Sequence, residues 1–270
     1  MHKPKIGRIR YLNLYPIFFG LERAGFECEY LNGCPSEVNG MLRRGLVDVS
    51  PSSSIEYLRR QGDYELVGGH SISSRGPIKS IFLISKRPVT GLNGAEIGIT
   101  WQTETSAVLM EIVLKKFFGL EFTPRQENGI APEQALNEYD AYLSIGDEAL
   151  AIAGSRAAAG RYVYDMGELW YQKTGLPFVF ALWIARKDWA SRDKGGFAAF
   201  CAALGKARDF GLSRLDEAVS VLAGEHQQLY KAVGPEGIIH YWRNIIYGLG
   251  EDEKKGVELF RKYALELGAL

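Results

Sequence analysis

Residues 6–21 read IGRIRYLNLYPIFFGL and combine the two kinds of hydrophobic spacing that decide the fold. Ile6, Ile9 and Tyr11 have the spacing of a β-strand, whereas residues 17–21 form the apolar start of a helix. Asn13 is the polar residue at the turn between them. An asparagine there either bonds to the backbone of the turn or reaches into a binding site, and the residues alone leave both open.

The same order of strand and helix recurs along the chain. Strands are predicted at 5–12, 26–33, 47–51, 64–73, 78–88, 94–101, 121–127, 140–146 and 177–187. Helices are predicted at 15–25, 34–46, 52–62, 105–119, 131–139 and from 147, with only helices after 195. Alternating strands and helices predict an α/β fold with mainly parallel sheets flanked by helices.

Two lobes are predicted from the positions of proline and glycine residues along the chain. Pro88, Gly91 and Gly94 mark a boundary, after which a second series of strands and helices begins. The apolar strand at 177–187 can return the chain to the first lobe. We therefore expect residues 1–88 and 179–270 to form a discontinuous first lobe that carries the C-terminal helices, and 89–178 an inserted second lobe. A ligand cleft is expected between them, at the carboxyl ends of the strands.

Composition narrows the class of function. Basic and acidic residues number 32 each, so the net charge is zero and no long-range field favours nucleic acid or an anionic membrane. No apolar run is long enough to span a membrane, and no secretory signal is recognisable, so we expect a cytoplasmic protein. The motifs of zinc, nucleotide and dinucleotide sites are absent from the sequence, which predicts neither a metal nor a cofactor.

Hydroxyl side chains gather at two predicted helix N-termini. Residues 52–54 are three serines, and Thr103, Thr105 and Ser106 stand in the corresponding place of the second lobe. A helix N-terminus offers free N–H groups and a partial positive charge, so these hydroxyls could help to bind a small dianion. Any one of them could equally be a helix cap. We expect caps among them and at least one ligand contact at each N-terminus.

The remaining candidate residues are less specific. Ser80 begins a predicted strand and could face a ligand or be an ordinary strand serine, and Asp147 after Gly146 could cap a helix or accept a ligand hydroxyl. His70 could be a base, although a lone histidine is more often structural. Four residues could enclose a ring-shaped ligand or pack in the core: Trp170, Tyr171, Thr174 and Phe178.

Six motifs in this order resemble those of the chorismate dehydratases, which open the futalosine route to menaquinone. The motifs are RYLNLYP (10–16), SPSSSIEYL (50–58), KSIFLIS (79–85), TWQTETSAVL (100–109), YLSIGDEAL (142–150) and ELWYQKTGLPFVFALW (168–183). The resemblance implies a two-lobed type II periplasmic-binding-protein-like fold. It also implies a hydro-lyase that converts chorismate into 3-[(1-carboxyvinyl)oxy]benzoate and water.

The resemblance implies roles for individual residues. The family's active-site asparagine corresponds to Asn13 and its strand serine to Ser80, which makes these two the catalytic candidates. Substrate binding is assigned to Ser53, Ser54, Thr105, Ser106, Gly146, Asp147 and Phe178. The expected partner is chorismate, with a homodimer left open. Two alternatives are a sister 1,4-dihydroxy-6-naphthoate synthase, which typically opens with a different motif and uses a histidine, and a non-catalytic small-anion binding protein.

Overall fold

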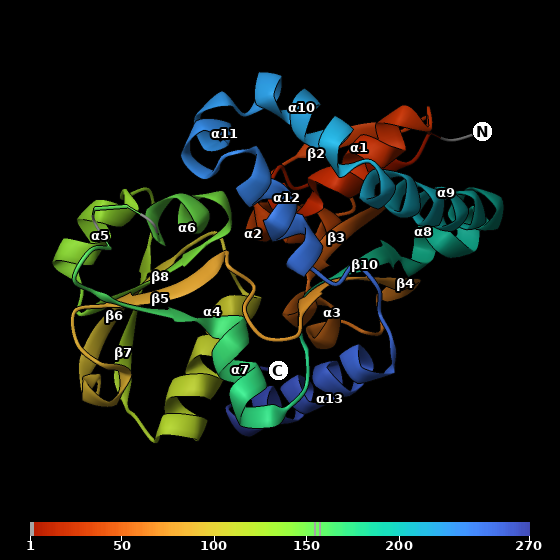
Figure 1. Ribbon diagram of the computed structural model, residues 1–270. Coiled ribbons are helices and arrows are strands. Elements are labelled where there is room, and N and C mark those ends of the chain that lie inside the picture. Colours follow the sequence, from red (N-terminus) through yellow and green to blue (C-terminus); the bar gives the residue numbers. More distant parts are fainter. Residues whose placement is uncertain (1–2, 154, 157) are drawn as a thin grey trace. The chain divides into compact units, whose positions relative to one another are not determined.

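The computed structural model describes residues 3–153, 155, 156 and 158–270, and the chain forms two compact units (Figure 1). The first unit comprises Met1–Ser73 and Val179–Gly250, and the second Ser74–Phe178 and Glu251–Leu270. The predicted boundary at residue 88 is therefore wrong. The strand β5 (Ile81–Ser85) pairs with strands of the second unit, and its backbone hydrogen bonds place it there.

The first unit contains a mixed sheet of five strands, in the order β2-β1-β3-β10-β4. Its strands are β1 (Lys5–Arg8), β2 (Glu29–Asn32), β3 (Val49–Ser53), β4 (Tyr64–Ser74) and β10 (Phe178–Arg186). β1 runs parallel to β2 and β3, whereas β10 runs antiparallel to β3. β3 and β10 lie between other strands in this order, and their burial agrees with that place. Every residue of β3 is buried, and all but two residues of β10 are buried.

Helices flank this sheet. They are the 3-10 turn η1 (Leu12–Leu14), α1 (Tyr15–Arg23), α2 (Pro35–Arg43), α3 (Ser54–Arg59), α8 (Lys187–Arg192), α9 (Lys194–Ser213), α10 (Leu215–Glu225), α11 (Gln227–Val233) and α12 (Pro235–Asn244). Two glycines allow α1 and α9 to pack backbone to backbone. A Cβ at Gly20 would lie 2.0 Å from the Ala207 carbonyl oxygen, and one at Gly211 would lie 1.9 Å from that of Pro16. No larger residue fits at either position without moving a helix.

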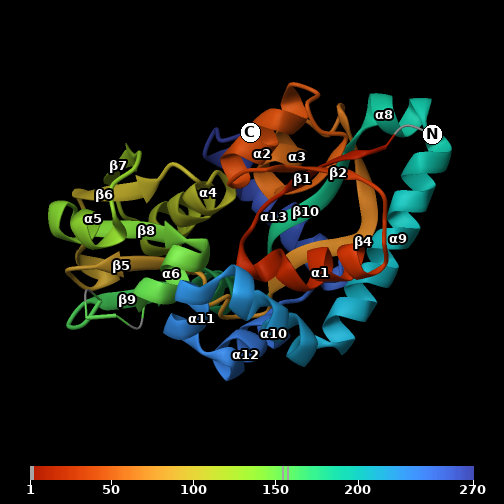
Figure 2. The ribbon, with the colours of Figure 1, turned by 90° about the horizontal axis from the view of Figure 1, so that it is seen from above.

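The second unit contains another mixed sheet, in the order β7-β6-β8-β5-β9 (Figure 2). Besides β5, its strands are β6 (Ala95–Thr100), β7 (Phe122–Glu127), β8 (Ala141–Ile145) and β9 (Tyr162–Asp165). β6 is parallel to β7 and β8, whereas β5 is antiparallel to β8 and β9. The prediction of mainly parallel sheets is therefore corrected to mixed sheets with both parallel and antiparallel pairs. In each unit, the strand on which the chain crosses from the other unit, β5 or β10, pairs antiparallel with its neighbour.

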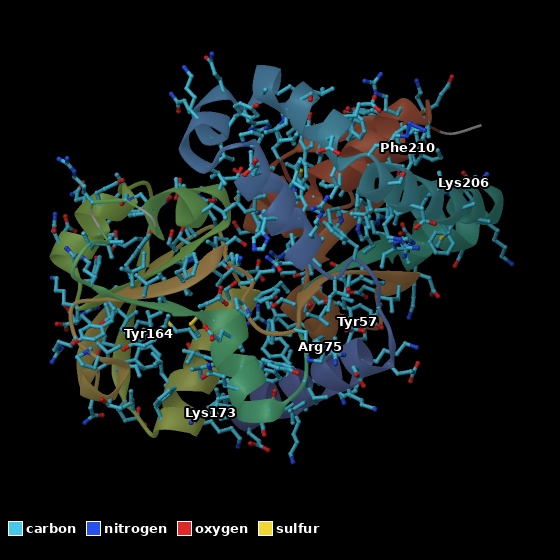
Figure 3. The ribbon with its side chains drawn as sticks, in the orientation of Figure 1. Tyr57, Arg75, Tyr164, Lys173, Lys206 and Phe210 are labelled. Carbon is cyan, nitrogen blue, oxygen red and sulfur yellow. The ribbon has the colours of Figure 1, made fainter. Side chains whose placement is uncertain are left out.

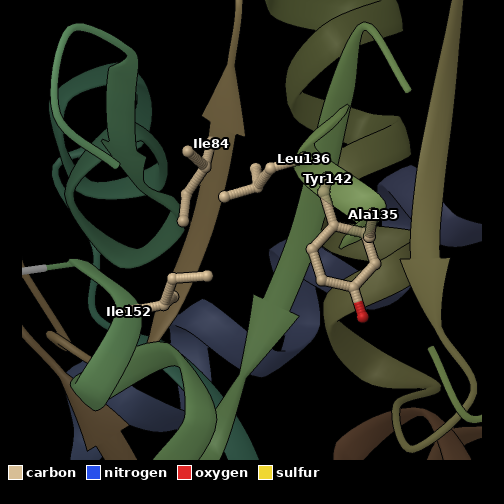
Figure 4. Packing of buried hydrophobic residues seen from close by; sticks show 5 residues of the cluster. All are labelled: Ile84, Ala135, Leu136, Tyr142 and Ile152. Carbon is tan, nitrogen blue, oxygen red and sulfur yellow. The ribbon is translucent and has the colours of Figure 1, made fainter. Parts of the chain in front are cut away.

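Helices cover both faces of the second sheet, with α5 and α6 on one side and α4 and α7 on the other (Figure 1). They are the 3-10 turn η2 (Val89–Gly91), α4 (Thr105–Glu111), the π-helix η3 (Ile112–Phe117), α5 (Pro132–Glu138), α6 (Gly146–Ala153), α7 (Met166–Thr174) and α13 (Glu251–Glu266). The single helix predicted at 105–119 thus changes to π-helical hydrogen bonding midway. Under α5 and α6 the core consists of Ile84, Ala135, Leu136, Tyr142 and Ile152 (Figure 4).

The last helix, α13, belongs to the second unit, which corrects the prediction that all C-terminal helices pack on the first lobe. Its Phe260 packs edge-to-face on Phe178, with ring centroids 5.0 Å apart, and Gly256 lies against the Pro177 carbonyl. Arg75, labelled in Figure 3, pairs with Asp252 of this helix at 2.8 Å. The sequence shows that this helix is amphipathic but not which apolar surface it covers. Within the described part of the chain, no helix is both long and apolar enough to cross a membrane.

Candidate functional site

The carboxyl edge of the first sheet carries the candidates of the first unit. β1 and β3 are parallel neighbours, with Ile6 opposite Val49, so both strands end at the same edge. β1 leads into η1, which contains Asn13, and β3 ends at Ser53, one residue before α3 begins. The structure therefore brings the RYLN motif and the serine run to one edge of the sheet.

Asn13 has an amide oxygen that lacks a partner. The residue is half-buried and its Oδ1 is inaccessible to water, yet Oδ1 accepts no hydrogen bond from any described residue. Leaving a buried acceptor unpaired costs about 1–3 kcal/mol, and such groups are rare in native proteins. A residue that only completed a turn would use this oxygen on the backbone. Among the described residues the fold makes no use of this acceptor, so Asn13 stays a candidate for a ligand contact.

The serines of the first unit have partners within the protein. Ser53 Oγ accepts a hydrogen bond from Asn39 Nδ2 at 2.7 Å, and its backbone N–H donates to Asn39 Oδ1 at 3.3 Å. Ser54 is fully buried, and its Oγ donates to the Val179 carbonyl of β10 at 2.6 Å. Neither hydroxyl caps α3. These bonds tie α2 and β10 to the end of β3.

The carboxyl edge of the second sheet gathers the remaining candidates. β6 and β8 are parallel neighbours, and they lead into α4, which begins at Thr105, and α6, which begins at Gly146. Because β5 is antiparallel to β8, with Ile81 opposite Ile145, β5 starts where β8 ends. Ser80, directly before β5, thus lies at the same edge. The Gly146 N–H donates to the Ser80 carbonyl at 2.8 Å.

The polar residues at this edge are largely buried. Ser80 is 1% exposed, and Thr105 and Ser106 are each 3% exposed. The Ser106 N–H donates to Thr103 Oγ1 at 3.3 Å, so the Thr103 hydroxyl satisfies one N–H group in the first turn of α4, although the N-cap residue itself is Glu104. Asp147 lies half-buried in the first turn of α6. Gly146 has a φ of 67°, in the region that favours glycine, at the turn from β8 into α6.

A cavity of about 460 Å³ in the second unit was not anticipated from the sequence. Its lining includes Trp101, Tyr142 and three glutamates, Glu127, Glu133 and Glu148. Burial raises the pKa of the Glu148 carboxyl, and the neighbouring charge of Glu133 raises it further. An acidic lining disfavours the carboxylates of a dianion. These glutamates are spread over three segments, and no local sequence signal links them.

The first unit holds a cavity of about 380 Å³ beside the end of β1, also missed from the sequence. Arg8 and Arg10 line it together with His226. The Arg8 guanidinium lies 5.2 Å from the ring centroid of Phe18 and donates to Glu22 at 2.6 Å. These arginines place cationic groups close in sequence to Asn13, Arg8 at the end of β1 and Arg10 between β1 and η1, in a cavity that Glu22 and Glu225 also line.

Two predicted candidates lie in the interior. Phe178 is fully buried, with its ring centroid 5.1 Å from that of Trp170, so the structure gives it a packing role. His70 lies in β4, where burial and the charge of Arg208 lower its pKa to about 4. Its Nδ1 has no hydrogen-bond partner among the described residues. Within those residues, no group of three or more histidine, cysteine or acidic side chains could hold a metal ion.

Residues 4–266 match the model of a protein family described as menaquinone biosynthesis. The chain belongs to this family. It is 32% identical over 268 residues to a chorismate dehydratase from Thermus thermophilus, an alignment that covers 94% of this chain and 93% of the relative. A 1,4-dihydroxy-6-naphthoate synthase from the same organism is 24% identical over 179 residues, which cover 65% of this chain and 61% of that relative.

Solved structures show the same fold. A protein from Archaeoglobus fulgidus superposes with a TM-score of 0.81 at 17% identity, covering 100% of this chain and 99% of its own. The periplasmic aliphatic sulphonate binding protein from Escherichia coli superposes with a TM-score of 0.67 at 14% identity, covering 100% and 94%. The fold of the family member described here is thus periplasmic-binding-protein-like, as the resemblance implied.

Proposed function

We propose that this protein is a chorismate dehydratase, a hydro-lyase that converts chorismate into 3-[(1-carboxyvinyl)oxy]benzoate and water. The identity to the Thermus enzyme over nearly the whole of both chains supports the reaction. The buried, unpartnered amide oxygen of Asn13 is the observation in the structure that carries the proposal. It is an acceptor without a use in the fold, on the motif where the reaction requires a polar group.

The chemistry makes modest demands on the protein. A proton leaves the ring carbon that bears the enolpyruvyl ether, and hydroxide leaves the neighbouring carbon as the ring becomes aromatic. Aromatisation supplies the thermodynamic drive. The protein must hold the dianion in one pose, polarise the leaving hydroxyl and leave a proton acceptor within reach.

Asn13 and Ser80 are the proposed catalytic residues. The Asn13 amide can donate through Nδ2 to the leaving hydroxyl and accept through Oδ1, so it suits a group whose charge changes during the reaction. The Ser80 hydroxyl can donate to a carboxylate or to the leaving oxygen. A charge-neutral polar group of either kind stabilises developing charge when it is held rigidly and shielded from water.

We assign the substrate carboxylates and hydroxyls to groups at the two helix N-termini of the second unit. Thr105 and Ser106 begin α4, and Gly146 and Asp147 begin α6, where the partial positive charge of a helix N-terminus favours an anionic group. Ser53 and Ser54 remain candidates of lower rank, because their hydrogen bonds to Asn39 and Val179 already explain their burial. Phe178 is not retained, since it has no accessible surface.

The proton acceptor is proposed to be a carboxylate of the substrate itself. His70 is buried and has a pKa of about 4, so it is a weak base, and no other histidine has been assigned to the reaction. Single substitutions of His70 and Glu148 should each leave substantial turnover. Loss of turnover at only one of them, with the fold intact, would identify that residue as the base and reject the substrate-carboxylate hypothesis.

Incubation of the purified protein with chorismate, followed by mass spectrometry, tests the reaction. The expected product is lighter than chorismate by one water and carries an aromatic ring. A naphthoate synthase or a non-catalytic binding protein would leave chorismate unchanged, and calorimetric titration would then show whether chorismate binds at all. The futalosine route, a cytoplasmic location and a homodimer remain predictions.

A further inference from the structure

The segment before β5 has an unusual backbone conformation at Lys79. Its φ is 66°, which makes it the one residue other than glycine with a positive φ among those the structure describes. A side chain disfavours this region because Cβ approaches the carbonyl oxygen. Such a conformation persists only where surrounding groups impose it, and it is frequent at functional sites. The next residue is Ser80.

Asp165 holds this conformation in place. Its carboxylate accepts two backbone hydrogen bonds from the segment, from Ile78 N–H at 3.0 Å and from Lys79 N–H at 2.6 Å. The same carboxylate caps α7, accepting from the Gly167 and Glu168 N–H groups at 2.9 and 3.1 Å. A helix cap requires only the second pair. The first pair joins two segments that lie 86 and 87 residues apart in sequence.

The start of α7 is fitted closely to the same segment. A Cβ at Gly167 would lie 2.7 Å from the Gly76 carbonyl oxygen and 2.8 Å from Ser74 Oγ. Ser80 is held on its other side by the bond from the Gly146 N–H to its carbonyl. The backbone of Ser80 is thus fixed from both directions, by Asp165 before it and by Gly146 after it.

We propose that Asp165 is a positioning residue: it imposes the left-handed conformation of Lys79 and thereby sets the direction of the Ser80 hydroxyl toward the substrate. This inference rests on the proposed function, in which Ser80 acts on chorismate. Asp165 itself is not a catalytic residue, because it is only 7% exposed and its carboxylate accepts four backbone hydrogen bonds.

Two substitutions and their combination test the role. Asp165→Asn keeps the size but replaces Oδ2, the acceptor of the Lys79 N–H, with an NH2 group that cannot accept, while Oδ1 can still accept from Ile78, Gly167 and Glu168. We expect kcat to fall about 10- to 100-fold with a smaller change in KM, because a misplacement near 1 Å has effects of this order. Lys79→Gly removes the Cβ that disfavours a positive φ, and it should leave kcat near normal. The double variant should recover most of the lost kcat, a coupling that a merely structural role would not produce.

Asp193→Asn is the matched control. Asp193 caps α9, accepting from the Gly196 N–H at 2.9 Å, and it lies in the first unit. Because asparagine keeps an oxygen that can cap the helix, both the melting temperature and kcat should change little. If Asp165→Asn has a normal kcat, or loses activity that Lys79→Gly does not restore, the positioning role is wrong.

Amide hydrogen exchange gives a readout that does not depend on activity. In Asp165→Asn the Lys79 amide should exchange at least about tenfold faster, since it loses its acceptor Oδ2, whereas Ile78 keeps Oδ1. Unchanged exchange at the Lys79 amide would overturn the proposal even if the wild-type protein proves inactive on chorismate. Faster exchange together with an inactive wild type would reject the proposed function and leave the clamp on residues 78 and 79 standing.

Discussion

Asn13 and Asn39 are two asparagines of the first unit with opposite hydrogen-bonding states. Asn13 Oδ1 is buried without a partner among the described residues. Asn39 is fully buried, and both ends of its amide bond to Ser53. Replacing each with leucine, which is close in size but has no amide, separates a role in the reaction from a role in folding.

The two substitutions should affect the free energy of unfolding differently. Asn39→Leu leaves the buried N–H and Oγ of Ser53 without this partner, which should cost about 2–4 kcal/mol. Asn13→Leu removes an acceptor that is already unpaired, so stability should be unchanged or rise by about 1 kcal/mol. For units of this size each kcal/mol shifts the melting temperature by about 2–4 °C. Asn39→Leu should therefore melt about 5–15 °C lower, and Asn13→Leu at or slightly above the wild-type temperature.

Scanning calorimetry and steady-state kinetics on chorismate measure both effects. Asn13→Leu should lose at least about 100-fold in kcat/KM, the usual effect of removing one group that stabilises developing charge. Asn39→Leu, assayed well below its melting temperature, should retain most activity. If Asn13→Leu destabilises the protein as much as Asn39→Leu does, or turns over chorismate normally, Asn13 is a turn residue and the reasoning fails.

Two further predictions concern stability. Burial lowers the pKa of His70 to about 4, so the folded chain protonates this imidazole at lower pH than the unfolded chain. The free energy of unfolding should therefore fall by about 3 kcal/mol as the pH is lowered from 6.5 to 4. Urea unfolding across this range should show a flatter pH dependence in His70→Gln, and an equally steep one would contradict the buried, neutral ring. Gly20→Ala should destabilise the protein by more than about 2 kcal/mol, because its Cβ would lie 2.0 Å from the Ala207 carbonyl oxygen. Gly205→Ala in α9 has open space around its Cβ and should stabilise by about 0.5–1 kcal/mol; equal effects of the two would refute the close packing.

Local patterns explain what the sequence could predict. The spacing of Ile6, Ile9 and Tyr11 and the serines at 52–54 placed strands and helix starts within a few residues of those observed. They also placed Asn13 at the turn after the first strand and Ser54 at a helix start, because strand and helix order is a local property. The two-lobed fold followed from the same alternation and from the resemblance.

Long-range pairing explains what the sequence could not predict. Nothing in the local sequence of β5 or β10 distinguishes a parallel from an antiparallel strand, and the apolar stripe of α13 does not specify its partner. Asp165 before α7 has the form of a helix cap, but its bonds to Ile78 and Lys79 depend on how the strands are ordered. Likewise the Ser54 hydroxyl could have been a cap, and only the sheet order brings Val179 to it.

A single-turnover comparison of the wild type with Asn13→Leu tests the central claim most directly. Each protein is mixed in excess with chorismate, quenched over time and measured by mass spectrometry. The wild type should convert chorismate completely into a product lighter by one water, while the variant, melting at no lower temperature, should leave most of it intact. Intact chorismate with the folded wild type would contradict the dehydratase function, and equal conversion by both proteins would contradict the role of Asn13.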